Sequence, residues 1–188
     1  MGKKNSKLSA VFIDRDGTII FDKKYLNSTK QIELYPFVVD SIKKLNDAGF
    51  VVIITTNQSG ISRGMFTEND LKFINKKIIK LIEEKGAKID DVCYCPHVDF
   101  DKCNCRKPKT GMIDRCVKKF CIDLKKSYAI GDTFRDYFFG LNMGGSGILV
   151  LTGHGMKEYN RMINIGIKPI VSRTLESAVN RIIKNNKM

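Results

Sequence analysis

Two kinds of hydrophobic pattern alternate along the chain. Continuous apolar runs predict buried β-strands, and stretches with apolar residues three or four positions apart predict helices that bury one face. The runs that predict strands are residues 8–13, 50–56, 89–94, 127–131 and 147–151. The stretches that predict helices are residues 36–48, 67–85, 111–120, 134–142 and 175–183. Because the two kinds follow one another, the sequence predicts parallel βαβ units.

The ends of two predicted helices carry recognisable signals. Pro36 precedes the first helical stretch, and Gly49 follows it where glycine commonly ends a helix. Thr67 and the acidic residues after it form a capping pattern for the second stretch. The expected core face of this second helix is Leu71, Ile74, Ile78 and Leu81. The predicted fold is therefore α/β, an open and mostly parallel sheet with helices on both faces, with residues 1–188 as one domain.

Composition narrows the class of protein. The chain has 188 residues, of which 43% are hydrophobic and 28% charged, and this balance excludes a disordered or fibrous chain. The longest apolar run is far below the roughly 20 residues that a membrane helix needs. The N-terminus lacks the apolar core of a secretory signal. We therefore expect a cytoplasmic protein that has no membrane partner.

Net charge indicates the kind of ligand. The chain has 33 lysines and arginines against 20 acidic residues, a net charge of +13, which favours an anionic partner. A phosphorylated metabolite and a nucleic acid both satisfy that requirement. No basic stripe interleaved with aromatic residues is evident, and this argues against nucleic acid.

Polar residues gather where the predicted strands end. Asp14 and Asp16 follow the first strand, Thr56 ends the second, and Asp132 and Asp136 follow the fourth. The carboxyl ends of parallel strands meet at one edge of a sheet, where these carboxylates would repel each other unless a cation lay between them. Oxygen ligands from Asp14 and Asp132 suit Mg²⁺.

Such an arrangement can transfer a phosphoryl group. When Mg²⁺ and a lysine neutralise a phosphate, the Asp14 carboxylate can attack phosphorus without prohibitive repulsion. Asp16 would then protonate the departing alkoxide and later accept a proton from the attacking water. A tight turn without chemistry is the alternative interpretation of residues 14–18, and the other polar clusters argue against it.

The six cysteines form a further pattern. A chain without a signal peptide is expected in a reducing compartment, where a disulfide framework is rare. A Cys₃His set fills the four tetrahedral positions of Zn²⁺ and leaves none for water, so the ion would be structural. The set is Cys95, His97, Cys103 and Cys105. The expected role of the zinc is to hold the loop that carries Arg106 and Lys107.

The remaining cysteines are expected outside this site. Cys93 lies on the predicted third strand and is not counted as a ligand. Cys116 and Cys121 fall on a predicted helix, and we expect both in the hydrophobic core.

Four segments resemble, in order, the motifs of the haloacid-dehalogenase-like phosphatases. They are Asp14-Arg-Asp-Gly-Thr18, Thr56-Asn57, Lys107 and Gly131-Asp132-x-x-x-Asp136. The resemblance implies that Asp14 is the nucleophile and that Asp16 is the general acid and base, with a main-chain carbonyl that also binds Mg²⁺.

The same resemblance implies roles for the other motif residues. Thr56 and Lys107 would hold the transferring phosphoryl group. Asp132 would bind Mg²⁺, and Asp136 would orient the site as a supporting acidic residue.

A narrower resemblance extends through three further segments. They are Thr56-Asn-Gln-Ser-Gly-Ile-Ser-Arg-Gly64, Cys95-Pro-His97 and Cys103-Asn-Cys-Arg-Lys-Pro-Lys109. These are similar to the D-glycero-D-manno-heptose 1,7-bisphosphate 7-phosphatases, in which the Cys-x-His and Cys-x-Cys pairs bind structural zinc. Histidinol-phosphate phosphatases form a sister group with similar motifs. The resemblance implies substrate contacts by Asp22, Tyr25, Asn57, Gln58, Ser59, Arg106 and Thr133.

The chain departs from the family pattern near the expected sugar. Lys23-Lys24 stands where the family has His-Gly, and Thr133 stands where many relatives have lysine. A sugar bisphosphate would need a second phosphate site, for which the candidates are Lys23, Lys24, Arg63 and Arg106. His154 is interpreted as a loop residue without a catalytic role.

The leading hypothesis is a monomeric, Mg²⁺-dependent phosphatase without a large cap domain, acting on a small phosphorylated sugar. Its expected reaction is hydrolysis of the 7-phosphate of D-glycero-D-manno-heptose 1,7-bisphosphate through an aspartyl-phosphate. The alternatives are a histidinol-phosphate phosphatase, which would share every catalytic residue, and a DNA 3′-phosphatase.

Overall fold

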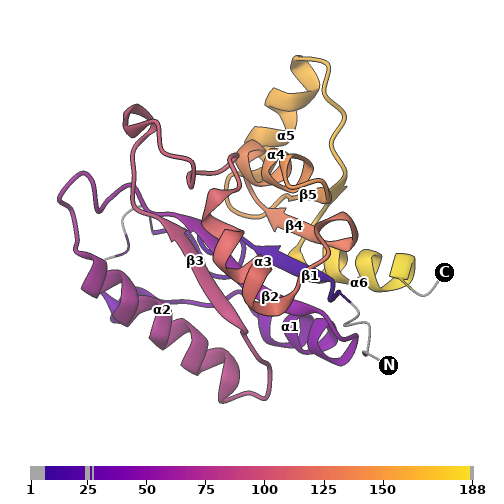
Figure 1. Cartoon of the computed structure of the whole chain (residues 1–188), viewed down its shortest axis with the longest axis horizontal. Helices are drawn as coiled ribbons and strands as arrows, with labels where there is room; N and C mark the ends of the chain where they lie inside the picture. Colours follow the sequence, from indigo (N-terminus) through magenta and orange to yellow (C-terminus); the bar gives the residue numbers. More distant parts are fainter. Residues whose placement is uncertain (1–6, 24–25, 27, 187–188) are drawn as a thin grey trace.

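Six parallel strands form one sheet in the order β3-β2-β1-β4-β5-β6 in the computed structural model of the protein, which describes residues 7–23, 26 and 28–186 (Figure 1). The strands are β1 (Ala10–Ile13), β2 (Val51–Asn57), β3 (Asp91–Cys95), β4 (Tyr128–Gly131), β5 (Ser146–Val150) and β6 (Val171–Ser172). The predicted open parallel sheet is confirmed. Its order reverses beside β1, so the strand ends on both sides of β1 open onto one crevice.

Helices cover both faces of the sheet (Figure 1). They are α1 (Val38–Asp47), α2 (Glu68–Glu83), α3 (Asp114–Phe120), α4 (Phe134–Asn142), α5 (Gly155–Asn164) and α6 (Leu175–Asn186). Short 3₁₀ helices are η1 (Thr29–Gln31), η2 (Asp99–Asp101), η3 (Gly111–Ile113) and η4 (Leu124–Lys126). Val11 and Ile13 of β1 belong to the core formed with α1, α2 and α6, whereas Ala10 and Phe12 belong to the core formed with α3 and α4. Alternate residues of β1 thus pack against the helices on opposite faces of the sheet.

Helix α2 begins as its capping pattern predicts. The Thr67 hydroxyl accepts from the backbone N–H of Asp70, and the Asp70 carboxylate accepts from the backbone N–H of Thr67. The core face ends on Ile82, which is fully buried, while Leu81 is only half-buried. The prediction of Leu81 is wrong because Ile82 lies four residues after Ile78, on the same face of the helix.

Two elements in the C-terminal third are absent from the prediction. Met156, Tyr159 and Met162 of helix α5 lie three positions apart, as in an amphipathic helix, but the helix is mostly polar and buries only Gly155 and Met162, so the prediction missed it. Strand β6 has two residues, both half-buried, at the edge of the sheet. The expected helix at 111–120 is instead divided between η3 and α3.

The cysteines outside the expected zinc set lie in different environments. Cys116 is fully buried, as predicted, and its Sγ lies 2.8 Å from the Sγ of buried Cys93. The placement of Cys121 in the core is wrong, because this residue is exposed and ends α3 with a φ of 51°. In the described ranges, no helix combines the length and the apolar character that crossing a membrane requires.

Helix α4 packs closely against β5 where Gly140 of the helix meets Gly147 of the strand. A Cβ built on Gly140 would meet the Cα of Gly147 and the carbonyl oxygen of Ser146, each at 2.6 Å. This close contact holds the last turn of α4 against β5, while Asp136 in the first turn lies against Gly131 at the end of β4.

We expect Gly140→Ala to destabilise the protein. In an exposed helix this change would stabilise by about 1 kcal/mol, whereas the clash with the β5 backbone should cost about 3 kcal/mol, so the net loss should be about 2 kcal/mol. Urea unfolding measures the difference, with Lys77→Ala on the exposed side of α2 as the control. A Gly140→Ala protein as stable as wild type would contradict the close contact.

Candidate active site

A cleft of about 220 Å³ opens at the carboxyl ends of β1, β2 and β4. It is lined by Asp14, Asp16, Asp22, Thr56, Asn57, Arg106, Lys107, Asp132, Thr133, Arg135, Asp136 and His154. The structure thus brings together the four motifs that lie far apart in the sequence. The loop that contributes Arg106 and Lys107 lies between β3 and α3.

Lys107 is the buried cation of this cleft. Its Nζ lies 2.6 Å from Asp14 Oδ1 and 2.5 Å from Asp136 Oδ1, and it donates to the carbonyl of Thr55 at 2.8 Å. Burial alone would lower the pKa of Lys107, but the charges of Asp136 and Asp14 outweigh it and raise that pKa above its ordinary value. Lys107 therefore remains positively charged at neutral pH.

Three carboxylates surround this one lysine. Asp14, Asp132 and Asp136 are all buried, and one oxygen of each lies within 4.8 Å of the others. Burial, with repulsion from the neighbouring carboxylates, raises the pKa of Asp14 well above its ordinary value despite Lys107. Burial and Asp136 raise the pKa of Asp132 to about 7. A single lysine thus leaves the cluster with excess negative charge, which a divalent cation would neutralise.

The backbone is closed tightly around Asp132. A Cβ on Gly17 or on Gly153, both with positive φ, would collide with the Asp132 carboxylate. The backbone N–H of His154 also donates to Asp132 Oδ2 at 2.7 Å. These contacts hold a hard oxygen ligand opposite Asp14, and this donor set fits Mg²⁺.

Asp136 differs from the other two carboxylates because its oxygens already have partners. Oδ1 binds Lys107, and Oδ2 accepts from the backbone N–H and the hydroxyl of Thr133 in the capping box of α4. Both oxygens of Asp136 are thus engaged by protein groups, one of them by Lys107. The Thr133 hydroxyl, expected at the substrate, is engaged with Asp136 at 2.5 Å.

Asp16 is held by residues that sequence reasoning had only partly identified. Arg15 Nε and NH2 donate to its two carboxylate oxygens at 3.0 and 3.1 Å, and Gln58 Nε2 donates to Oδ2 at 2.9 Å. The Thr56 hydroxyl also lies 3.4 Å from Oδ2. Arg15 is itself buried and donates to Asn75 of α2 at 3.1 Å. In the sequence, the signal for this role of Arg15 is its position between Asp14 and Asp16.

The Asn57 side chain binds the backbone of the loop that carries Lys107. Its side-chain amide accepts from the backbone N–H of Lys107 at 3.0 Å and donates to the backbone carbonyl of the same residue at 3.2 Å. This pair of hydrogen bonds joins the end of β2 to the loop and fixes the origin of the lysine side chain.

A neighbouring pocket of about 370 Å³ continues the cleft beside Asp16. Its lining residues are Asp16, Asp22, Asn57, Gln58, Ser59, Gly60 and His154. His154, interpreted as a loop residue without a catalytic role, lies at the wall of this pocket, where its Nε2 is 2.9 Å from Asp22 Oδ2. Tyr25, an expected substrate contact, lies outside the described residues.

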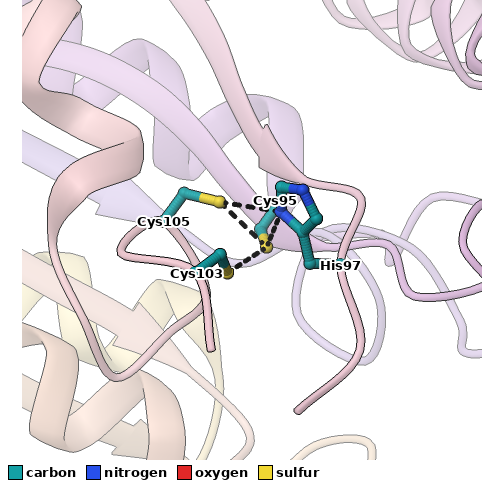
Figure 2. Close-up of side chains that lie close together, drawn as sticks. All are labelled: Cys95, His97, Cys103 and Cys105. Atoms are coloured by element: carbon teal, nitrogen blue, oxygen red, sulfur yellow. Dashed lines mark hydrogen bonds between the residues drawn. The ribbon is translucent and has the colours of Figure 1, made fainter. Parts of the chain in front are cut away.

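Four side chains form a compact Cys₃His cluster at the end of β3 (Figure 2). The Cys95 sulfur lies 3.7 Å from that of Cys103 and 3.2 Å from that of Cys105, and 3.6 Å from His97 Nδ1. Ligands of a tetrahedral zinc ion with Zn–S near 2.3 Å lie about 3.7 Å apart, so the cluster fits that ion. Burial opposes ionisation of Cys103, but hydrogen bonds to its sulfur from the Arg106 backbone and from Cys105 lower its pKa to about 7.

Hydrogen bonds join the cluster to the cleft. The backbone N–H of Gln58 donates to the carbonyl of Cys95 at 2.7 Å, and Arg106 NH1 donates to the carbonyl of His97 at 3.1 Å. Lys107 follows Cys105 by only two residues, so the position of the cluster determines where the buried lysine enters the cleft.

The basic residues that were candidates for a second phosphate site lie in different places. Arg106 lines the cleft, whereas Lys23 and Arg63 line neither pocket, and Lys23 pairs with Glu33 at 3.1 Å. Lys24 lies outside the described residues. Arg135, which was not among the candidates, lines the cleft from the first turn of α4.

Comparisons with known proteins agree with this geometry. The model of the polynucleotide kinase 3 phosphatase family matches residues 9–140. A D-glycero-beta-D-manno-heptose-1,7-bisphosphate 7-phosphatase of Neisseria meningitidis serogroup A is 36% identical over 155 residues, 82% of this chain and 83% of the relative. The histidine biosynthesis bifunctional protein HisB of Blochmanniella floridana is 38% identical over 141 residues, 73% of this chain but 40% of that longer protein.

A solved structure is similar over nearly the whole chain. The D,D-heptose 1,7-bisphosphate phosphatase from B. bronchiseptica, complexed with magnesium and phosphate, has a TM-score of 0.85 and 29% sequence identity. The match covers 95% of this chain and 99% of that one. The chain therefore belongs to the polynucleotide kinase 3 phosphatase family of haloacid-dehalogenase-like phosphatases, in the branch of the heptose 1,7-bisphosphate 7-phosphatases.

Proposed function

We propose that this protein is a Mg²⁺-dependent phosphatase that removes the 7-phosphate of D-glycero-D-manno-heptose 1,7-bisphosphate. The observation that carries the proposal is the contact of Asp14 with the buried cation Lys107 inside a cleft that also holds Asp16 and Asp132. The relatives named for this activity support the choice of substrate.

The reaction has two steps. In the first, an Asp14 carboxylate oxygen forms a bond to phosphorus while the bond from phosphorus to the sugar oxygen breaks, and Asp16 donates a proton to that oxygen. In the second, water attacks phosphorus, Asp16 takes a proton from the water, and the bond to Asp14 breaks. The products are the heptose 1-phosphate, with a free 7-hydroxyl group, and inorganic phosphate, and both aspartates are restored.

Other residues hold the phosphoryl group during this transfer. Lys107, anchored by Asp136 and by the Thr55 carbonyl, offers a fixed positive charge, and Thr56 offers a hydroxyl. A charge that is already in place costs no reorganisation when negative charge develops. Asp14, Asp132 and the main-chain carbonyl of Asp16 would hold Mg²⁺, which when bound neutralises phosphate charge.

We infer that the Cys95, His97, Cys103 and Cys105 cluster holds a structural zinc ion. Four protein ligands leave no coordination position for water or substrate. The support for this role is the short connection from Cys105 to Lys107, together with the compact arrangement of the four side chains (Figure 2).

Histidinol phosphate is the second candidate substrate, and the similarity to HisB is the observation that favours it. Phosphate release from D-glycero-D-manno-heptose 1,7-bisphosphate, histidinol phosphate and a 3′-phosphorylated DNA oligonucleotide compares the three possibilities. We expect kcat/KM to be highest by far for the heptose bisphosphate. A preference for histidinol phosphate or for the oligonucleotide would contradict the proposal.

Asp14→Asn should abolish turnover. The amide keeps the shape of the side chain but cannot form the aspartyl-phosphate, so the rate of phosphate release should fall at least about a thousandfold. Circular dichroism should show an intact fold. Retention of more than about a tenth of wild-type activity would refute the role of Asp14 as nucleophile.

Cys103→Ser should lower zinc content and thermal stability together. The free energy of binding a structural metal is also free energy of folding, so the wild-type protein should hold one zinc per chain and the variant should lose both zinc and several degrees of melting temperature. Cys121→Ser, an exposed cysteine outside the cluster, is the matched control. Full stability of zinc-free wild-type protein would argue against this role.

A further inference from the structure

The proposed function requires a bisphosphate substrate, which brings a second phosphate into the site. The buried cation of the site, Lys107, is already paired with protein carboxylates. Lys107 is bound between Asp14 and Asp136. The pocket beside Asp16 offers no counter-charge, because neither lysine nor arginine is among the described residues that line it. A second phosphate must find its positive charge elsewhere in the cleft.

Two guanidinium groups remain at the cleft. Arg106 and Arg135 both line it, and they come from elements far apart in the sequence, the loop after β3 and the first turn of α4. Asp99 of η2 joins them, because its Oδ1 accepts from Arg106 Nε at 2.7 Å and its Oδ2 accepts from Arg135 NH2 at 3.0 Å.

The bridge leaves donors free for an anion. Each guanidinium has five N–H groups. Arg106 uses Nε for Asp99 and NH1 for the carbonyl of His97, and Arg135 uses NH2 for Asp99. Two positive charges against one carboxylate leave a net charge of +1 on this trio. Asp99 is largely exposed, with 62% of its side chain accessible, so its own ion pairs contribute little to stability.

Packing also restricts where the two arginines can lie. The Arg106 side chain is only 13% exposed and that of Arg135 32% exposed. Arg135 in addition lies over the ring of Phe134, with its Cζ 5.8 Å from the ring centroid. Side chains that are already ordered lose less entropy when they bind a ligand.

We propose that Arg135, together with Arg106 and bridged to it by Asp99, binds the second phosphate and selects a sugar bisphosphate over a sugar monophosphate. Planar guanidinium groups suit phosphate because they donate paired hydrogen bonds to its oxygens. Arg135 is then a specificity-determining residue that does not take part in the transfer at Asp14. The inference rests on the proposed function, since only a bisphosphate supplies the second anion.

The test compares two substrates that differ only in the second phosphate, D-glycero-D-manno-heptose 1,7-bisphosphate and D-glycero-D-manno-heptose 7-phosphate. Arg135→Gln should raise KM for the bisphosphate and lower its kcat/KM about tenfold to a hundredfold, as expected for the loss of charge-assisted hydrogen bonds. The kcat/KM for the monophosphate should change less than about threefold.

Arg161→Gln is the matched control. Arg161 also lies over the ring of Phe134, with its Cζ 5.0 Å from the centroid, but it does not line the cleft. Replacing it removes a cation from the same aromatic ring and should leave the ratio of kcat/KM values for the two substrates unchanged.

The failures are distinguishable. If the wild type hydrolyses the bisphosphate but Arg135→Gln lowers kcat/KM equally for both substrates, or for neither, the second-phosphate site is refuted and the proposed function stands. The site is also refuted if Arg161→Gln causes the same selective loss. If the wild-type protein does not hydrolyse the bisphosphate, the proposed function itself fails.

Discussion

The buried contact of Lys107 with Asp14 and Asp136 is the constraint on which the rest of the site depends. Two carboxylates at the ends of neighbouring strands, Asp14 and Asp132, and one in the first turn of α4, Asp136, could not be buried together as charged groups without a positive charge among them. One lysine cannot balance all three when they are ionised, so a divalent cation would favour their ionised form. The same lysine would also stabilise a bound phosphate, because its charge is held beside the Asp14 oxygen.

Lys107 reaches that position through a loop that has little regular structure. The loop is anchored at one end by β3 and the Cys₃His cluster (Figure 2). Near its other end, the side-chain amide of Asn57 binds the backbone of Lys107. It also carries Asp99 and Arg106, so one ordered segment positions both the residue that would hold the transferring phosphate and a residue of the proposed second anion site. The proposed zinc binding, phosphoryl transfer and substrate selection therefore all involve the same stretch of chain.

The sequence contained enough information to predict the order of the buried strands along the chain and the residues at their carboxyl ends, because both are written in local patterns. It did not predict α5, which is mostly polar and buries only Gly155 and Met162, or β6, which has two residues. Arg15 and Arg135 were not identified either, since their roles depend on partners from distant elements, Asn75 and Asp99. Local patterns predict elements and motifs, whereas pairs between distant segments of the chain are evident only in the folded structure.

A double-mutant cycle on the buried contact tests the account most directly. Lys107→Met and Asp136→Asn, alone and together, are compared by urea unfolding in magnesium-free buffer. Lys107→Met alone should lower the free energy of unfolding by about 3–5 kcal/mol because it leaves buried carboxylates without a cation. The double variant should lose clearly less than the sum of the two single losses. Additive losses would show that Lys107 and Asp136 do not interact in the folded protein and would contradict the account.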